Sequence, residues 1–81
     1  MNEMHPVEVT ALFATDGTIT PLRFRWRGSL YLVESSGRQW RAEDGYHVLV
    51  MTSSGLATEL LFAVQENRWY LTHPGPKPIA I

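Results

Sequence analysis

Arginine recurs at alternate positions of the stretch PLRFRWRGSLYLV, residues 21–33, where it is interleaved with aromatic residues. Proteins that bind single-stranded nucleic acid often combine these residue types, because cationic side chains track the phosphates and flat side chains stack on the bases. A plainer explanation also exists, since a strand with one buried face places every second residue in solvent. Two hypotheses therefore stay open for the arginines, a nucleic-acid-binding surface and a solvated, ion-paired outer face of a sheet.

The other residue types that could do chemistry point to no reaction. The serines cluster at turn-like positions, where local hydrogen bonding explains them. The histidines are His5, His47 and His73. In the register described below, His47 and His73 lie roughly 10–12 Å apart, which is too far to share a metal ion, and we predict a buried, hydrogen-bonded His47. Cysteine is absent, and no phosphate-binding glycine motif occurs. We therefore predict no enzymatic activity, no catalytic residues, no metal and no cofactor.

Turn-forming dipeptides divide the chain at short intervals. They are Asp16-Gly17, Gly28-Ser29, Ser36-Gly37, Asp44-Gly45, Ser54-Gly55 and Glu66-Asn67. Such pairs favour tight hairpin turns, and the runs between them are rich in residues that suit strands. We predict a single small all-β domain over residues 1–73, an antiparallel meander of about seven short strands that curls into a small barrel or half-barrel. We predict that residues 74–81 form a proline-rich extended tail.

Two-residue turns fix which residues share a face of the sheet. The predicted inner face collects Val7, Val9, Ala11, Phe13, Phe24, Trp26, Tyr31, Val33, Trp40, Leu49, Met51, Leu60, Phe62, Val64, Trp69 and Leu71. On the outer face, a hairpin at Ser36-Gly37 brings Arg41 beside the first arginines, and Glu34 lies opposite Arg23. The candidate nucleic-acid-binding residues are therefore Arg25, Arg27 and Arg41.

The same register turns a second set of apolar side chains outward, which water disfavours. They include the candidate partner-binding residues Tyr46, Val48, Leu61 and Tyr70. Four parts could cover this apolar surface: the N-terminal strand, the tail with Ile79 and Ile81, the barrel closing onto itself, or another protein chain. We expect either cover from within the chain or a protein partner, including a homodimer.

Composition limits the partners. The 81 residues carry a net charge of -1, so the whole protein offers no field that would attract nucleic acid or an anionic membrane. No segment approaches the ~20 apolar residues that span a bilayer, and the N-terminus lacks the pattern of a signal peptide. We expect a soluble, cytoplasmic protein without a membrane partner.

The order of aromatic and glycine residues resembles a small bacterial family of domains of unknown function. The matching positions are Trp26, Gly28, Tyr31, Val33, Trp40, Arg41, Phe62, Trp69 and Leu71, within residues 17–73. Domains of that family occur as short stand-alone proteins and at the end of Y-family polymerase-like repair proteins. The resemblance implies a DNA-repair context and no catalytic residues, although a shared fold does not establish a function.

Two functional hypotheses follow. The first is a non-enzymatic β module that binds another protein, in the repair context that the resemblance implies. The alternative is a weak binder of single-stranded nucleic acid through an arginine-rich sheet face.

Overall fold

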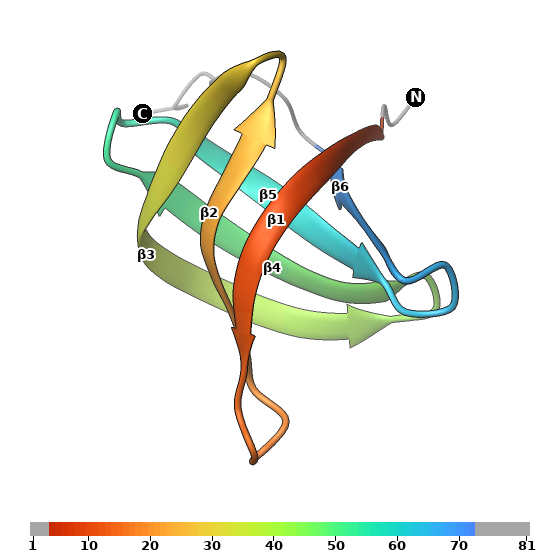
Figure 1. Cartoon of the computed structure of the whole chain (residues 1–81). Coiled ribbons are helices and arrows are strands. Elements are labelled where there is room, and N and C mark those ends of the chain that lie inside the picture. Colours follow the sequence, from red (N-terminus) through yellow and green to blue (C-terminus); the bar gives the residue numbers. More distant parts are fainter. Residues whose placement is uncertain (1–3, 73–81) are drawn as a thin grey trace, which may run out of the picture.

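Six antiparallel strands form a closed barrel in a computed structural model of the chain, which describes residues 4–72. The strands are β1 (His5–Phe13), β2 (Ile19–Trp26), β3 (Ser29–Ala42), β4 (Gly45–Thr52), β5 (Ala57–Ala63) and β6 (Arg68–Leu71). Each pairs with the next along the chain, and β6 pairs with the start of β1 to close the barrel (Figure 1). The prediction of a small all-β barrel is confirmed, with six strands in place of about seven. Residues 4–72 contain no helix that is long and apolar enough to cross a membrane.

The strand count differs because Ser36-Gly37 is not a turn. β3 continues through both residues and pairs with β4, with irregularities between Val33 and Ser35 and between Ser36 and Gln39. Extra residues of this kind bend a strand and increase its twist without ending it. β3 therefore passes from its partner β2 at one end of the barrel to β4 at the other, and the predicted hairpin at this position is wrong.

Two predicted turns are displaced by one residue. The β2–β3 loop is Arg27-Gly28, where both residues have positive φ (52° and 78°), as a type I′ turn requires. The β3–β4 loop is Glu43-Asp44, since Ala42 pairs with Gly45. When a two-residue loop moves by one position, each residue pairs with a residue two positions away along the opposite strand. Because side chains alternate with a period of two, the residues of each hairpin still share the same faces of the sheet.

The β4–β5 connection has the larger effect on the register. Thr52 donates its amide hydrogen to the carbonyl of Leu56, which leaves a loop of three residues between them. The odd loop length pairs Val48, rather than Leu49, with Leu60. Because side chains alternate, this shift reverses the predicted faces of β4. Leu49 and Met51 point outward, contrary to the prediction.

The barrel interior holds one hydrophobic core. Its buried members are Ile19, Phe24, Tyr46, Val48, Val50, Leu60, Trp69 and Leu71. Partly buried Val7, Val9, Ala11, Trp26, Tyr31, Val33 and Phe62 pack against them. The predicted inner faces of β2, β6 and the first half of β3 are therefore confirmed, as are Val7, Val9 and Ala11 of β1 and Leu60 and Phe62 of β5. Phe13 and Val64 were also predicted inside, but they are 57% and 53% exposed where β1 ends and just after β5 ends. Trp40 lies outside and stacks on His47 at 5.0 Å between ring centroids.

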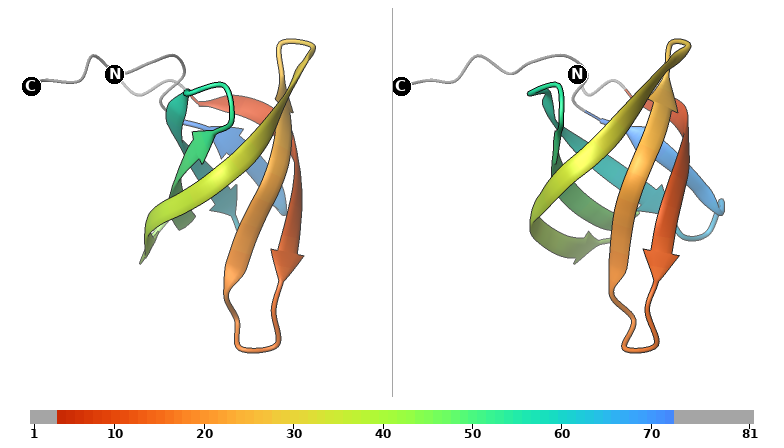
Figure 2. Two further views of the ribbon diagram at one scale, coloured as in Figure 1. Left: turned by 90° about the vertical axis from the view of Figure 1, so that its left-hand side faces the viewer. Right: turned by 60° about the vertical axis from the view of Figure 1, so that its left-hand side comes forward.

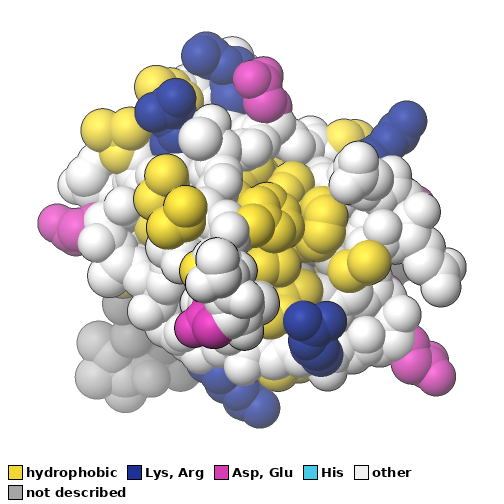
Figure 3. All heavy atoms as spheres, turned by 60° about the horizontal axis from the view of Figure 1, so that its bottom comes forward, with side chains coloured by type: hydrophobic (Ala, Val, Ile, Leu, Met, Phe, Trp, Pro, Cys, Tyr) yellow, Lys and Arg dark blue, Asp and Glu magenta, His cyan; other side chains and the backbone are white. Residues whose placement is uncertain are grey.

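The barrel opens at one end because β2 and β3 separate. They pair only from Arg23 to Trp26 on β2 and from Ser29 to Leu32 on β3. Figure 2 shows the two strands joined at their turn and diverging toward the opposite end. Viewed from the side of the β1–β2 turn, the space-filling surface shows an apolar hollow surrounded by charges of both signs (Figure 3).

Candidate functional site

The outer face of β1, β2 and β3 carries a column of arginines beside a column of leucines. Across the strands, Arg25 pairs with Leu30, and Arg23 pairs with Leu32. Their neighbours Phe24 and Tyr31 belong to the interior, so alternation directs these four side chains into solvent. We call Arg23, Arg25, Leu30 and Leu32 the arginine–leucine face.

Both columns are open to solvent. Leu30 is 49% exposed and Leu32 is 53% exposed. Neither Arg23 nor Arg25 forms an ion pair with a carboxylate of residues 4–72. The predicted position of Glu34 opposite Arg23 is wrong, because Leu32 occupies that place. The face therefore presents guanidinium groups without ion pairs next to uncovered aliphatic surface, although Glu8 of β1 lies across from Arg25.

The neighbouring residues continue this surface along β1 and β2. A groove of about 130 Å³ on the face is lined by Glu8, Thr10, Arg23, Phe24, Arg25 and Leu30. Leu22, at an irregularity in the β1–β2 pairing, and Leu12 on β1 are also exposed. Basic and hydrophobic side chains lie side by side at the upper left of Figure 3, apart from the central hollow. The face is thus part of a wider amphipathic surface.

The predicted group of Arg25, Arg27 and Arg41 is not brought together. Arg27 sits in the β2–β3 turn, where its guanidinium lies 4.6 Å from the centre of the Trp26 ring. Arg41 lies near the other end of β3, over the ring of Tyr46. Along β3 it lies eleven residue positions after Leu30, a contour of about 36 Å. The uninterrupted course of β3 is the reason that Arg41 is remote from Arg25.

The predicted partner-binding residues do not form an exposed surface either. Tyr46 and Val48 lie in the core, and Val48 is 0% exposed, because the β4 register is reversed. Leu61 and Tyr70 do lie opposite each other on the outside, as predicted. However, Leu61 is only 1% exposed, and the Tyr70 hydroxyl donates a hydrogen bond to Glu66. A partner cannot contact these four side chains together in this structure.

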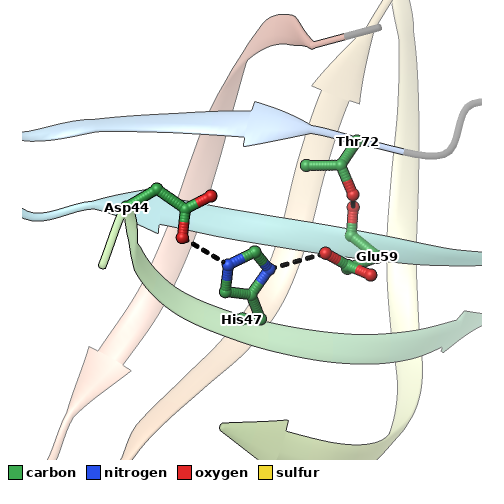
Figure 4. Close-up of polar contacts among 4 residues, drawn as sticks. All are labelled: Asp44, His47, Glu59 and Thr72. Carbon is green, nitrogen blue, oxygen red and sulfur yellow. Dashed lines mark hydrogen bonds and ion pairs between the residues drawn. The ribbon is translucent and has the colours of Figure 1, made fainter. Parts of the chain in front are cut away.

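A histidine held between two carboxylates is the main polar cluster of the described residues. His47 on β4 has its Nε2 atom 2.7 Å from Asp44 Oδ1 and its Nδ1 atom 2.6 Å from Glu59 Oε2 (Figure 4). Asp44 belongs to the β3–β4 turn and Glu59 to β5, while Thr72 donates its amide hydrogen to the Glu59 carbonyl. We call Asp44, His47 and Glu59 the histidine clamp. It joins a turn to two strands on the outside of the barrel.

The electrostatics of the clamp favour a protonated imidazole. Burial alone would lower the pKa of His47, but hydrogen bonds to Asp44 and Glu59, with their negative charges, outweigh burial and raise this pKa above 6.5. An imidazolium ion donates from both nitrogens, which matches two carboxylate acceptors. Neither nitrogen is then free to take a proton from a nucleophile. The prediction of a buried, hydrogen-bonded His47 is confirmed, although the ring lies on the outer face.

Other candidate sites are weaker. Within residues 4–72, no group of three or more histidine or acidic side chains is arranged to hold a metal ion. A cleft of about 370 Å³ opens between the β3–β4 turn and the end of β5. Its lining includes Arg41, Glu43, Asp44 and Glu66 along with apolar residues. This mixture of charges does not define one class of ligand. His73 and the proline-rich tail lie outside the described residues.

Sequence reasoning missed both partners of His47. Asp44 is three residues before it, so a contact across the turn could have been inferred locally. Glu59 becomes a neighbour only in the correct β4–β5 register, in which it pairs with Leu49 and faces outward beside His47. The outward positions of Leu30 and Leu32 follow from the alternation in β3. Sequence reasoning did not name them as candidate site residues, because it placed Arg41 beside Arg25.

Comparison of the chain with protein-family models, with curated proteins and with solved structures finds no match.

Proposed function

We propose that this is a cytoplasmic, non-enzymatic protein-interaction module that binds its partner through the arginine–leucine face. One observation carries the proposal: half-exposed Leu30 and Leu32 lie directly beside two arginines that lack ion-pair partners among the described residues. Interfaces combine apolar contact area with arginine, which supplies both packing and hydrogen bonds. The geometry therefore supports a surface that gains contacts when another protein covers it.

The alternative ligand, single-stranded nucleic acid, has less support from the same face. Base stacking requires exposed rings, but Phe24 and Tyr31 point into the core and Trp26 packs against it beneath Arg27. The outward neighbours of Arg23 and Arg25 are leucines. Aliphatic side chains offer no flat surface to a base, so the arrangement favours a protein partner.

The biological setting is also part of the proposal. The resemblance to a family found at the end of repair polymerase-like proteins supports a partner in a DNA-repair assembly. In such a setting the module would bring proteins together, and the nucleic acid would be contacted by other components.

Site-specific photo-crosslinking in cells of the source organism tests the proposed function. A photo-reactive amino acid replaces Leu32 in one variant and Val64 in a matched control. Val64 lies outside the face and is likewise 53% exposed. We expect a discrete protein adduct from position 32 that is absent from position 64. Identical adduct patterns, or no adduct at position 32, would contradict the proposal.

A nucleic acid titration separates the two hypotheses. Labelled oligothymidylate is added at about 50 mM and then about 200 mM salt, because phosphate contacts weaken steeply over that range. We expect no salt-sensitive binding that depends on Arg23 and Arg25. Binding that is strong at low salt and lost in the Arg23→Gln/Arg25→Gln variant would favour the nucleic-acid hypothesis instead.

A further inference from the structure

We propose that the partner segment is an acidic amphipathic α-helix that lies along β2 and β3. Its carboxylates would contact Arg23 and Arg25, and its apolar stripe would cover Leu30 and Leu32. This inference rests on the proposed function and adds the chemistry and shape of the partner.

The spacing of the two columns matches a helix. Alternate residues of a strand are about 6.7 Å apart along its axis, and helical residues four positions apart rise about 6.0 Å. Acidic residues at positions i and i+4 therefore align with Arg23 and Arg25. Apolar residues at i+3 and i+7 form the adjacent stripe of the helix. Neighbouring strands are about 4.8 Å apart, which places that stripe over Leu30 and Leu32.

The charges around the face select an acidic ligand and orient it. The positive charge of the face comes from Arg23 and Arg25, since Arg27 lies in the β2–β3 turn with its guanidinium over the ring of Trp26, which packs against the core. On the other side of the column, Glu8 of β1 pairs with Arg25. This carboxylate repels an acidic segment from β1, so the favourable position is over β2 and β3.

The strand pairing argues against an added strand. Peptides that extend a sheet need an edge with free backbone groups. Residues Arg23–Arg25 pair with β1 on one side and with β3 on the other. The arginine column therefore lies within the sheet, where a partner meets side chains only, and a helix presents its side chains in this way. The start of β3, residues 29–32, does not pair with β4, but a strand added along that edge would not reach Arg23 and Arg25 across β3.

The charges also argue against a second copy of this chain on the same face. A two-fold interface places identical patches against each other. Such a contact would bring four arginines together, Arg23 and Arg25 of each copy, with Glu8 of each copy as the one carboxylate that lines the groove beside them. The cost of that like-charge contact favours a different, acidic protein.

Synthetic peptides test the inference. The probe is a labelled 20-residue peptide with glutamates at i, i+4 and i+8 and leucines at i+3, i+7 and i+11, in an alanine- and glutamine-rich background. The control has the same composition with both stripes scrambled. Fluorescence anisotropy measures binding to the full chain at about 50 mM salt. We expect the striped peptide to bind at least about tenfold more tightly than the scrambled peptide. Both peptides carry the same net charge, but only the striped peptide can align its carboxylates with the arginines and its leucines with Leu30 and Leu32 at the same time.

Two charge-matched variants locate the binding. Arg23→Gln/Arg25→Gln should weaken binding of the striped peptide about fivefold, as expected for the loss of two exposed ion pairs. Arg38→Gln/Arg68→Gln removes the same amount of charge elsewhere on the protein. This control should change the affinity for the striped peptide less than about twofold. Circular dichroism confirms that each variant is folded. Equal binding of the two peptides, or equal effects of the two variants, would overturn the inference.

The outcome is distinguishable from failure of the proposed function. If position 32 yields a protein adduct in cells but the striped peptide shows no preference, the face is an interaction surface and the acidic helix is wrong. If position 32 yields no adduct, the proposed function itself fails.

Discussion

Replacing Glu59 with glutamine should destabilise the barrel in a pH-dependent way. The Glu59 carboxylate lies 2.6 Å from the His47 ring, and each side chain is only 11% exposed. Glutamine preserves the size of the side chain and can still accept a hydrogen bond. The substitution therefore removes the negative charge and little else, which makes it a specific probe of the histidine clamp.

The magnitude follows from the two kinds of hydrogen bond. A hydrogen bond to a charged group contributes about 1.5–3 kcal/mol, whereas a neutral one contributes about 0.5–1.5 kcal/mol. We expect Glu59→Gln to lower the free energy of unfolding by about 2 kcal/mol when His47 is protonated. For a domain of this size, that loss lowers Tm by about 10 °C.

The direction of the pH dependence comes from the raised pKa of His47. A group whose pKa is higher in the folded protein stabilises it below the unfolded value, here 6.5. That contribution disappears as pH rises through the folded pKa. The loss caused by Glu59→Gln should therefore be about 2 kcal/mol near pH 5.5 and fall below about 1 kcal/mol near pH 9.

Urea denaturation at both pH values measures the effect, with Glu34→Gln as the control. Glu34 is exposed on β3, and its substitution removes the same charge without touching the clamp. We expect the control to change stability by less than about 0.5 kcal/mol. A loss for Glu59→Gln that is the same at both pH values would refute the imidazolium clamp.

Three further predictions concern the register and the turns. Val48→Ala should lower the free energy of unfolding by about 2.5 kcal/mol, and Leu49→Ala should lower it by less than about 1 kcal/mol, as measured by thermal denaturation. A larger loss for Leu49→Ala than for Val48→Ala would contradict the β4 register. Gly45→Ala should cost about 3 kcal/mol or more by the same measurement, because its Cβ would lie 2.1 Å from the Phe62 carbonyl oxygen. The backbone amide of Thr18 donates a hydrogen bond to the Asp16 carboxylate and lowers the pKa of Asp16 below 3.8. The stabilisation that the ionised carboxylate provides should therefore be lost only as pH falls through this lowered pKa. Acid unfolding of the wild-type protein and of Asp16→Asn measures the difference.

Glycines with positive φ located turns but did not fix loop lengths, since Gly55 also has positive φ and lies in the three-residue loop that reverses the faces of β4. Gly28 marks the β2–β3 turn to within one residue, and the faces of β2 and the start of β3 follow correctly. Gly37 looks similar in the sequence but lies in an irregular stretch of a continuous strand. The dipeptide alone does not distinguish a turn from a bend, because the difference depends on which strand pairs with the residues that follow.

The outer face of the barrel was harder to predict because errors of register accumulate along the chain. One missing hairpin moved Arg41 away from Arg25, and one three-residue loop turned Val48 inward. Leu30 and Leu32 keep their predicted outward faces, because the displaced β2–β3 turn changes their partners on β2 by two residues and leaves the alternation intact. The arginine–leucine face is thus the part of the candidate site that alternation could predict, whereas Glu59 beside His47 needed the three-dimensional pairing of β4 with β5.

The most direct test of the interaction surface is the photo-crosslinking yield at position 32 in two backgrounds. If the arginine–leucine face binds an acidic protein partner, the adduct should form in the otherwise unchanged chain and be lost in an Arg23→Glu/Arg25→Glu background that remains folded. An Arg38→Glu/Arg68→Glu background should retain it. An adduct that survives reversal of Arg23 and Arg25 would contradict the account.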